Sequence, residues 1–320
     1  MADVQSSTLY AGSVSESAIY QVTKGEGFQW GDYVQTEVVV DGKPRQLTRA
    51  IHAANPLVAN IENPVVADFA TTPAITFDGR ELVASELAYK NTYKPRQWKD
   101  TFPTFQPSGT SIDLQMNPKI TSVIFDLAMN AIKQQMNELH AIGDLALSPD
   151  PMEWYDGFTT LILADSDPTQ VGTPAVLTSA NILAKVKELI QAVPARLRSK
   201  SNLFTFCSVA DYDLYMEARA TTQTYSPQTD VESNNKLIQS YGSKIKLIPI
   251  DGMPKDFIFT TLAGRDDSSN LVQGVWLEKD SDILKVFRFT EVDQSWRILM
   301  RMSMGVQYKS GLDIFYINNV

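Results

Sequence analysis

The sequence predicts an α+β protein in which an α/β unit is inserted between two β-rich portions. Residues 33–51 alternate between apolar and polar side chains, which is typical of β-strands. Residues 118–142 carry one continuous apolar stripe with three- and four-residue steps, which indicates a long amphipathic helix. Helical and strand patterns then follow one another between residues 176 and 264. A chain of 320 residues can bury a substantial core as one large or two modest domains.

The first 30 residues are polar and rich in Ser, Gly and Thr, without a sustained apolar period. A segment of this kind has no core of its own. We therefore expect residues 1–30 to form an extended arm that needs a partner to lie on.

A β-hairpin is predicted over residues 31–55. Two β-rich stretches flank Asp41-Gly42, and this dipeptide is a strong two-residue hairpin signal because both residues can take positive φ. We expect a long, largely exposed hairpin with Asp41, Gly42 and Lys43 at its tip.

Prolines interrupt the stretch from residue 56 to residue 116. Proline lacks the backbone N–H and clashes with the preceding helical turn, so a long helix is excluded here and short strands with turns are expected. A short helix over residues 79–89 also fits. The prolines are Pro56, Pro64, Pro73, Pro95, Pro103 and Pro107.

A long helix is predicted over residues 118–142. Asn117 is a good N-cap, Pro118 suits the first helical position, and Gly143 is a good stop. The helix would be about 36 Å long at 1.5 Å per residue. Because this is about twice the usual length in globular domains, we expect a structural spine.

Further helices and strands are predicted in the second half of the chain. A second amphipathic helix covers residues 178–198, and Pro194 is expected to end or bend it. The remaining elements are a strand at 203–209, a helix at 211–220, strands at 244–250 and 256–262, and a β-rich segment at 275–317.

Composition excludes several classes of protein. With 43% hydrophobic and 20% charged residues, the chain is expected to fold, and its single cysteine, Cys207, permits no internal disulfide. A net charge of -9 argues against a surface that grips nucleic acid. The opening residues lack the basic and apolar regions of a secretory signal, and no apolar run approaches the roughly 20 residues of a membrane span. We expect synthesis in the cytoplasm and no membrane partner.

Residues suited to catalysis are scarce. The Gly-x-x-x-x-Gly-Lys-Ser/Thr, Gly-x-Ser-x-Gly and His-Glu-x-x-His signatures are absent from the sequence. Of the two histidines, His140 is expected to stabilise a helix C-terminus through the helix dipole, and His52 to be a solvent-facing strand residue. Cys207 is expected to be a buried, inert thiol. We therefore predict no enzyme, no cofactor and no metal site.

Three charged or sulfur-containing groups have two interpretations each. Carboxylates spaced by two, as in Asp165 and Asp167, suit calcium, but they also form turns, which is the favoured interpretation. The basic group after the second helix faces water or contacts nucleic acid. The alternating methionines fill one face of a sheet or meet a partner subunit. The other carboxylate clusters are Asp150, Glu153 and Asp156 and the pair Asp266 and Asp267; the basic group is Arg196, Arg198 and Lys200; the methionines are Met300, Met302 and Met304.

The order of these elements resembles the Hong Kong ninety-seven type major capsid protein of tailed phages. Local sequence is similar as well, especially to capsid proteins of phages that infect Bacteroidetes. The similar segments are Ile142-Gly143-Asp144, Tyr155-Asp156-Gly157-Phe158, Gly305-Val306-Gln307-Tyr308 and Ile314-Phe315-Tyr316. The resemblance covers nearly the whole chain, without a single diagnostic motif.

The resemblance implies a division of the chain into functional parts. Residues 1–30 would be the N-terminal arm and residues 31–55 the extended loop, with Asp41, Gly42, Lys43 and Arg45 in contact with another subunit. A peripheral domain would comprise residues 56–175 and 265–320, including the spine helix 118–142, and an axial domain residues 176–264.

The resemblance also implies a structural function in the virion. The chain would be the major capsid subunit and form pentamers and hexamers of an icosahedral shell. Scaffold, portal and other virion proteins would be partners, and packaged double-stranded DNA a non-specific neighbour. The cross-link found in some relatives would join Lys43 to Asn318 or Asn319, but no matching Glu is identified.

Three alternatives stay open at this point. An encapsulin-like nanocompartment shell would share the same fold. A hydrolytic enzyme would need a pair of carboxylates that converge in a cleft. A tail or baseplate protein would form rings or tubes instead of icosahedral shells.

Overall fold

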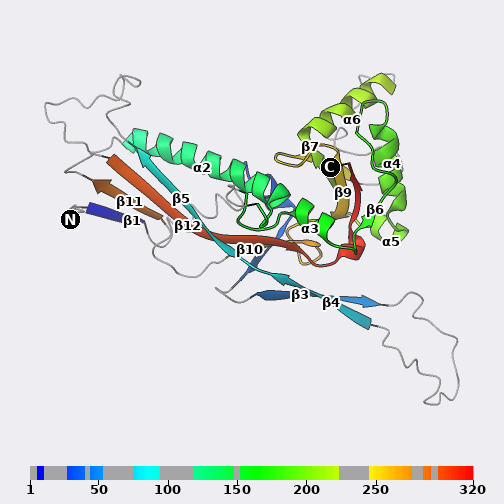
Figure 1. Cartoon of the computed structure of the whole chain (residues 1–320), viewed down its shortest axis with the longest axis horizontal. Helices are drawn as coiled ribbons and strands as arrows, with labels where there is room; N and C mark the ends of the chain where they lie inside the picture. The colour runs from blue at the N-terminus through cyan, green and yellow to red at the C-terminus, as the bar shows by residue number, and fades with distance from the viewer. Residues whose placement is uncertain are drawn as a thin grey trace, which may run out of the picture.

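The described part of the chain forms three β-sheets and a set of helices (Figure 1). The structure is a computed structural model that describes residues 6–10, 27–39, 44–52, 75–93, 118–147, 152–222, 245–275, 284–289 and 295–319. Within these residues the sheets have six, five and two strands. The fold class is therefore mixed α+β, as predicted.

The six-stranded sheet is built around β12, a 14-residue strand. β10 and β11 pair with one edge of β12 and β5 with the other, while β1 and β2 extend the sheet beyond β11 and β10. Met300 and Met304 of β12 are buried, which supports, for these two, the interpretation that the alternating methionines fill one face of a sheet. The strands are β1 (Ser6–Tyr10), β2 (Gln35–Val38), β5 (Ser85–Tyr93), β10 (Leu271–Val275), β11 (Leu284–Phe289) and β12 (Ser295–Tyr308).

The predicted long helix is present as α2 (Pro118–Ile142), with the predicted bounds. It runs alongside β5 and β12 (Figure 1). Its buried apolar face contributes to the same core as β12, while Leu127 and Ile142 of the same helix are exposed. The short helix α3 (Phe158–Ala164) follows. The buried apolar residues of α2 are Ala128, Met129, Ile132, Met136, Leu139 and Ala141.

The five-stranded sheet and three helices form a second body with its own core. Its strand order is β6-β13-β9-β7-β8. The predicted second helix is divided in two because Val193, which precedes Pro194, is extended, as residues before proline usually are. The strands are β6 (Thr169–Gln170), β7 (Leu203–Ser208), β8 (Lys246–Ile250), β9 (Phe257–Leu262) and β13 (Phe315–Asn318); the helices are α4 (Ile182–Ala192), α5 (Ala195–Arg198) and α6 (Val209–Thr222).

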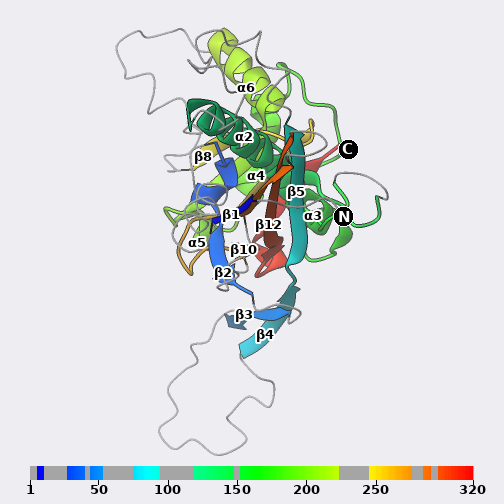
Figure 2. The same ribbon diagram turned by 90° about the vertical axis from the view of Figure 1, so that its left-hand side faces the viewer.

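The two-stranded sheet projects from the body of the molecule (Figures 1 and 2). It consists of β3 (Arg45–His52) and β4 (Ile75–Leu82), which pair antiparallel. We call these two strands the projecting strand pair.

The predicted pairing within residues 31–55 is wrong. β2 pairs in parallel with β10, and β3 pairs with β4, so the two strands that flank Asp41-Gly42 do not pair with each other. The Asp-Gly signal is local, whereas strand partners are chosen by burial of apolar side chains from distant segments. Asp41, Gly42 and Lys43 themselves lie outside the described residues.

Two other local expectations are corrected. Residues 79–89 belong to β4 and β5 instead of a short helix, because pairing with β3 and β12 outweighs their helical propensity. The predicted arm is not without structure in its described parts, since residues 6–10 pair with β11 and Phe28 and Trp30 are buried. Strand pairing through the backbone requires no apolar period. Residues 1–5 and 11–26 lie outside the described residues.

His140 does not have the predicted role at the helix end. Its side chain is fully buried, and burial lowers its pKa from 6.5 to about 4, so the ring is neutral at pH 7. Nε2 lies 3.3 Å from Oε1 of Gln273, and Nδ1 lies 2.8 Å from the Tyr155 hydroxyl, which can donate to it. A neutral ring gains no charge interaction with the helix dipole, so hydrogen bonding and packing explain this position.

Stability should fall as the pH is lowered from about 6.5 to about 4. In this pH window His140 takes up a proton in the unfolded chain but not in the folded chain. The free energy of unfolding therefore falls by up to roughly 3 kcal/mol. Urea unfolding at a series of pH values, for the wild type and for His140→Gln, measures this term. Parallel curves for the two proteins would show that His140 does not cause it.

Candidate functional site: the base of the projecting strand pair

A small apolar core holds the projecting strand pair against the six-stranded sheet. Leu47 of β3 and Leu82 of β4 pack with Val272 of β10 and with Val39, and all four are buried. Ala84 packs against this cluster. Residues from four separate described segments thus fix the base of the pair on the sheet.

Two glycines allow the base to lie directly on the sheet. Gly274 and Gly305 are register partners in β10 and β12, so they face the same side. A Cβ on Gly305 would lie 1.9 Å from the Val83 backbone oxygen, and one on Gly274 would lie 2.8 Å from Cγ2 of Val39. A side chain at either position would separate the sheet from the base of the pair.

Arg45 ties one side of the base to β2. Its Nη2 lies 2.6 Å from Oε2 of Glu37, and its Nη1 donates to the backbone oxygen of Val38 at 3.2 Å. Of the residues predicted to contact another subunit, Arg45 is the one that the structure describes, and it contacts residues of its own chain. Its contact with a second subunit stays a prediction.

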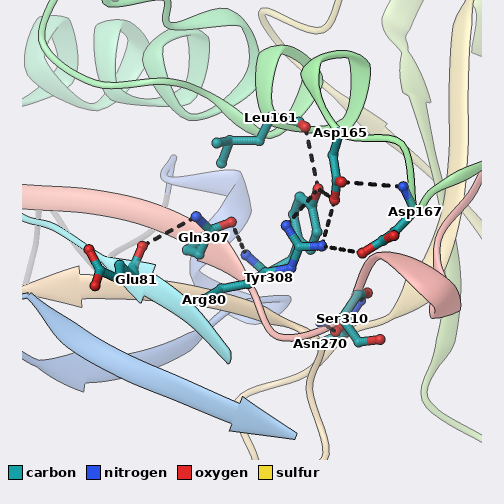
Figure 3. Close-up of polar contacts among 9 residues, drawn as sticks. All are labelled: Arg80, Glu81, Leu161, Asp165, Asp167, Asn270, Gln307, Tyr308 and Ser310. Carbon is teal, nitrogen blue, oxygen red and sulfur yellow. Dashed lines mark hydrogen bonds and ion pairs between the residues drawn. The ribbon is translucent and has the colours of Figure 1, made fainter. Parts of the chain in front are cut away.

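A polar cluster around Arg80 ties β4 to the body (Figure 3). Nη2 of Arg80 lies 2.5 Å from Oδ2 of Asp165 and 2.9 Å from Oδ2 of Asp167. The guanidinium lies over the Tyr308 ring, 4.5 Å from its centroid, and the Tyr308 hydroxyl donates to Oδ2 of Asp165 at 2.6 Å. We call Arg80, Asp165, Asp167 and Tyr308 the Arg80 cluster.

Electrostatics favour a charged Asp165 in this cluster. Burial alone would raise the pKa of its carboxyl, but hydrogen bonds from Tyr308 and the Asp167 backbone, together with the Arg80 charge, lower it. Burial and then the hydrogen bond to Asp165 raise the pKa of the Tyr308 hydroxyl. The hydroxyl therefore stays protonated and acts as a donor.

The Arg80 cluster decides between the two interpretations of Asp165 and Asp167. Both carboxylates bind Arg80, and the Asp167 backbone N–H donates to Oδ1 of Asp165 at 3.2 Å, as in an Asx turn. The turn interpretation is supported. Among the described residues, no group of three or more His, Cys, Asp or Glu side chains is arranged to hold a metal ion.

The chain passes between the two larger sheets three times close to this cluster. The passages are residues 165–168, 263–270 and 309–314, which join α3 to β6, β9 to β10, and β12 to β13. Asn270 links the second passage to the third, since its Nδ2 donates to the Ser310 oxygen at 2.9 Å and its Oδ1 accepts from the Ser310 N–H at 2.8 Å (Figure 3).

Removing the Tyr308 hydroxyl should lower the free energy of unfolding by about 1–2 kcal/mol, since the bond to a charged carboxylate is lost. Asp165 gives stability through its lowered pKa, so the loss in Tyr308→Phe should be present above the ordinary carboxyl pKa of 3.8 and shrink below it. Denaturant unfolding measures it. Tyr316→Phe is the control, because Tyr316 is also buried and its hydroxyl makes no hydrogen bond among the described residues. Equal losses in both variants would contradict the role of Tyr308.

The other residues singled out in the sequence are scattered. Cys207 is fully buried, as predicted, and burial and then the Asp211 charge raise the pKa of its thiol. Arg196 lies 3.6 Å from Asp313, while its side chain is 64% exposed. Asp267 binds Lys309 at 3.0 Å.

Three further predictions concern residues whose side chains or partners are only partly described. His52 lies in β3, and its side chain is outside the described set. Asn318 lies in β13, and the N–H of Asn319 donates to the Asp256 oxygen at 3.2 Å. Their predicted cross-link partner, Lys43, is not described.

Sequence reasoning missed the residues that make this site. Arg80, Tyr308, Asn270 and the two glycines carry no local signature, because their partners are distant in the chain. Arg80 and Tyr308, for example, are separated by 228 positions. The spacing of Asp165 and Asp167 was the one visible signal.

Comparison of the whole fold with solved structures finds chains of phage capsids and of a virus-like particle. The chain is similar to a chain of the satellite phage P4 procapsid, with a TM-score of 0.59 and 10% identity over 99% of this chain and 94% of that chain. It is similar to the capsid protein of the Myoviridae phage XM1, with a TM-score of 0.52 and 9% identity over 100% and 96%. A virus-like particle from Pyrococcus furiosus gives a TM-score of 0.51 and 9% identity over 97% and 100%.

The comparisons define a fold class. No protein-family model and no curated protein matches the sequence. The α+β fold of this chain matches the fold of chains from phage capsids. Sequence identities of 10% and 9% support similarity of fold and nothing beyond it. Among the described helices, none has the length and apolar character required to cross a bilayer.

Proposed function

We propose that this chain is the major capsid subunit of a tailed phage, with a fold of the Hong Kong ninety-seven type. The observation that carries the proposal is the similarity to a phage procapsid chain over 99% of this chain and 94% of that one. The relationship to Bacteroidetes phages rests on local sequence resemblance.

In this proposal each part of the fold has a role in the shell. α2 is the spine helix and, with the six-stranded sheet, forms the peripheral domain. The five-stranded body is the axial domain, and it includes β6 and β13 from outside the predicted range 176–264. The projecting strand pair replaces residues 31–55 as the extended loop, because it is the pair of strands that leaves the body (Figure 2).

Assembly would proceed through repeated contacts between identical chains. Heterologous contacts that close by rotation form rings, which here would be the pentamers and hexamers of an icosahedral shell. A two-stranded sheet gains little stability alone, so the projecting strand pair would be stabilised by a neighbouring subunit. Scaffold and portal proteins are expected as partners, with packaged DNA as a non-specific neighbour and the virion as the location.

An encapsulin-like nanocompartment is the second candidate. The similarity to a virus-like particle from Pyrococcus furiosus, which covers 97% of this chain, is compatible with a shell of this kind. A hydrolytic enzyme has less support, since the carboxylates of Asp165 and Asp167 are both engaged in ion pairs with Arg80.

Electron microscopy with light scattering of the purified chain, alone and with co-expressed scaffold, tests the proposal. Closed shells or five- and six-membered rings are the expected result. Replacing residues 53–74 by a short Gly-Ser linker should leave the monomer folded and abolish shells. A chain that stays monomeric with scaffold, or shells that form normally without residues 53–74, would contradict it. Shells that enclose enzymes instead of DNA would favour the nanocompartment.

A further inference from the structure

The Arg80 cluster lies where the chain passes between the six-stranded and five-stranded sheets. Asp165 and Asp167 belong to the passage from α3 to β6, and Tyr308 is the last residue of β12 before the passage to β13. Arg80 itself comes from the projecting strand pair. A single side chain therefore contacts the start of two of the three connections between the sheets.

The three passages are also held to one another. A Cβ on Gly311 would lie 2.6 Å from Cβ of Asp167 and 3.0 Å from Oδ2 of Asp165, so the passage from β12 to β13 touches the carboxylates directly. Asn270, in the second passage, binds Ser310 of the third, and the Lys309 N–H donates to the Asn270 backbone oxygen at 2.8 Å. Movement of one passage therefore displaces the others.

The contacts of Arg80 restrict the orientation of its side chain. Arg80 binds two carboxylates with one nitrogen, lies on an aromatic face, and has a side chain that is only 17% exposed. A planar guanidinium held from two directions fixes the orientation of the strand that carries it. Lysine would retain the charge but lose the planar stacking on Tyr308.

We propose that Arg80 is a positioning residue that couples the direction of the projecting strand pair to the relative orientation of the two larger sheets. When the five-stranded body turns relative to the six-stranded sheet, Asp165 and Asp167 move and Arg80 moves the pair with them. The inference rests on the proposed function for its purpose: in a shell, the direction of the pair and the tilt of the axial domain would change together.

Arg45 provides a matched control at the same base. Among the described residues it binds Glu37 and Val38, which belong to β2 of the six-stranded sheet. Loss of Arg45 should therefore weaken the base without uncoupling the pair from the five-stranded body. Both Arg45 and Arg80 are arginines in ion pairs. A difference between the two variants therefore reflects which part of the protein each arginine binds, and not the loss of an arginine ion pair as such.

Distances between spin labels in the unassembled protein test the coupling. Labels at Thr48→Cys, on the projecting strand pair, and Gln134→Cys, on α2, report the direction of the pair; both positions are exposed, and buried Cys207 stays unlabelled. Arg80→Ala should broaden the distance distribution roughly twofold, and Arg45→Ala much less. Asn270→Ala, which loosens the passages, should broaden it when Arg80 is present and add nothing in Arg80→Ala.

Two outcomes would overturn the inference: an unchanged distribution in Arg80→Ala, or equal broadening in Arg45→Ala. If Arg80→Ala does not fold, the double variant Asp165→Asn with Asp167→Asn removes the same ion pairs at constant volume and is measured instead. Because the labels are read without assembly, broadening in a chain that never forms shells would support the coupling and contradict the proposed function. Normal shells with unchanged distances would support the proposed function and contradict the coupling.

Discussion

Gly305→Ala should lower the free energy of unfolding by about 3 kcal/mol or more, the upper part of the range for overpacked sites. The new Cβ would lie 1.9 Å from the backbone oxygen of Val83, and a backbone atom cannot move aside as a flexible side chain can. Either β12 or the bend between β4 and β5 would have to shift. Chemical denaturation of the unassembled chain measures the loss, and the soluble yield should fall with it.

Gly79→Ala is the matched control for this prediction. Gly79 lies in β4 near the same base, and a Cβ there would meet only Oε1 of Gln46 at 3.7 Å, an ordinary contact. Its stability should stay close to the wild type or rise slightly, because alanine restricts the unfolded chain. Equal stability of Gly305→Ala and the wild type would show that the base of the projecting strand pair does not lie against the sheet as described.

Elements with a complete local signal were predictable from the sequence. α2 has an N-cap residue, a proline at its first position, a sustained apolar stripe and a glycine stop, and its bounds are those predicted. The structure also shows why residue 143 is a glycine, since a Cβ there would lie 2.2 Å from the Tyr155 backbone oxygen. β7 and α6 were found for the same reason, because period and turn residues agree within each segment.

Strand partners were not predictable, because pairing depends on residues far apart in the chain. The alternation at residues 33–51 correctly indicates strands, yet β2 finds its partner in β10, more than 200 positions away. The apolar cluster of Val39, Leu47, Leu82 and Val272 makes that choice, and each of its members is an ordinary strand residue in the sequence.

The candidate site was less predictable than the fold. Arg80 has no special local context, and it gains its role when the passage from α3 to β6 and the end of β12 bring Asp165, Asp167 and Tyr308 around it. The sequence around Gly305 likewise gives no signal, since glycine is required there only because the Val83 backbone packs directly against it. In this chain the local pattern specifies the elements, while contacts between residues far apart in the sequence determine how the projecting strand pair is held.

Trp30→Ala should destabilise the chain by about 4 kcal/mol, the middle of the range for truncating a buried large aromatic residue. Trp30 is fully buried, and its ring lies 5.1 Å from that of Phe158 and 5.4 Å from that of Phe206. Nε1 donates to the backbone oxygen of Asn137 at 3.2 Å. The indole therefore joins α2, α3 and β7, so its loss should loosen the packing between the two larger bodies as well as the local core.

Trp154→Ala is the control, because it removes the same side chain from a position that is 40% exposed. Its loss should cost less than about 1 kcal/mol in unfolding free energy, since truncation at an exposed site leaves no cavity. Thermal and denaturant unfolding of both variants in the unassembled state separates the two. If Trp30→Ala were as mild as Trp154→Ala, residues 27–34 would not be part of the core. The predicted arm would then extend to residue 34, instead of ending where Phe28 and Trp30 enter the body.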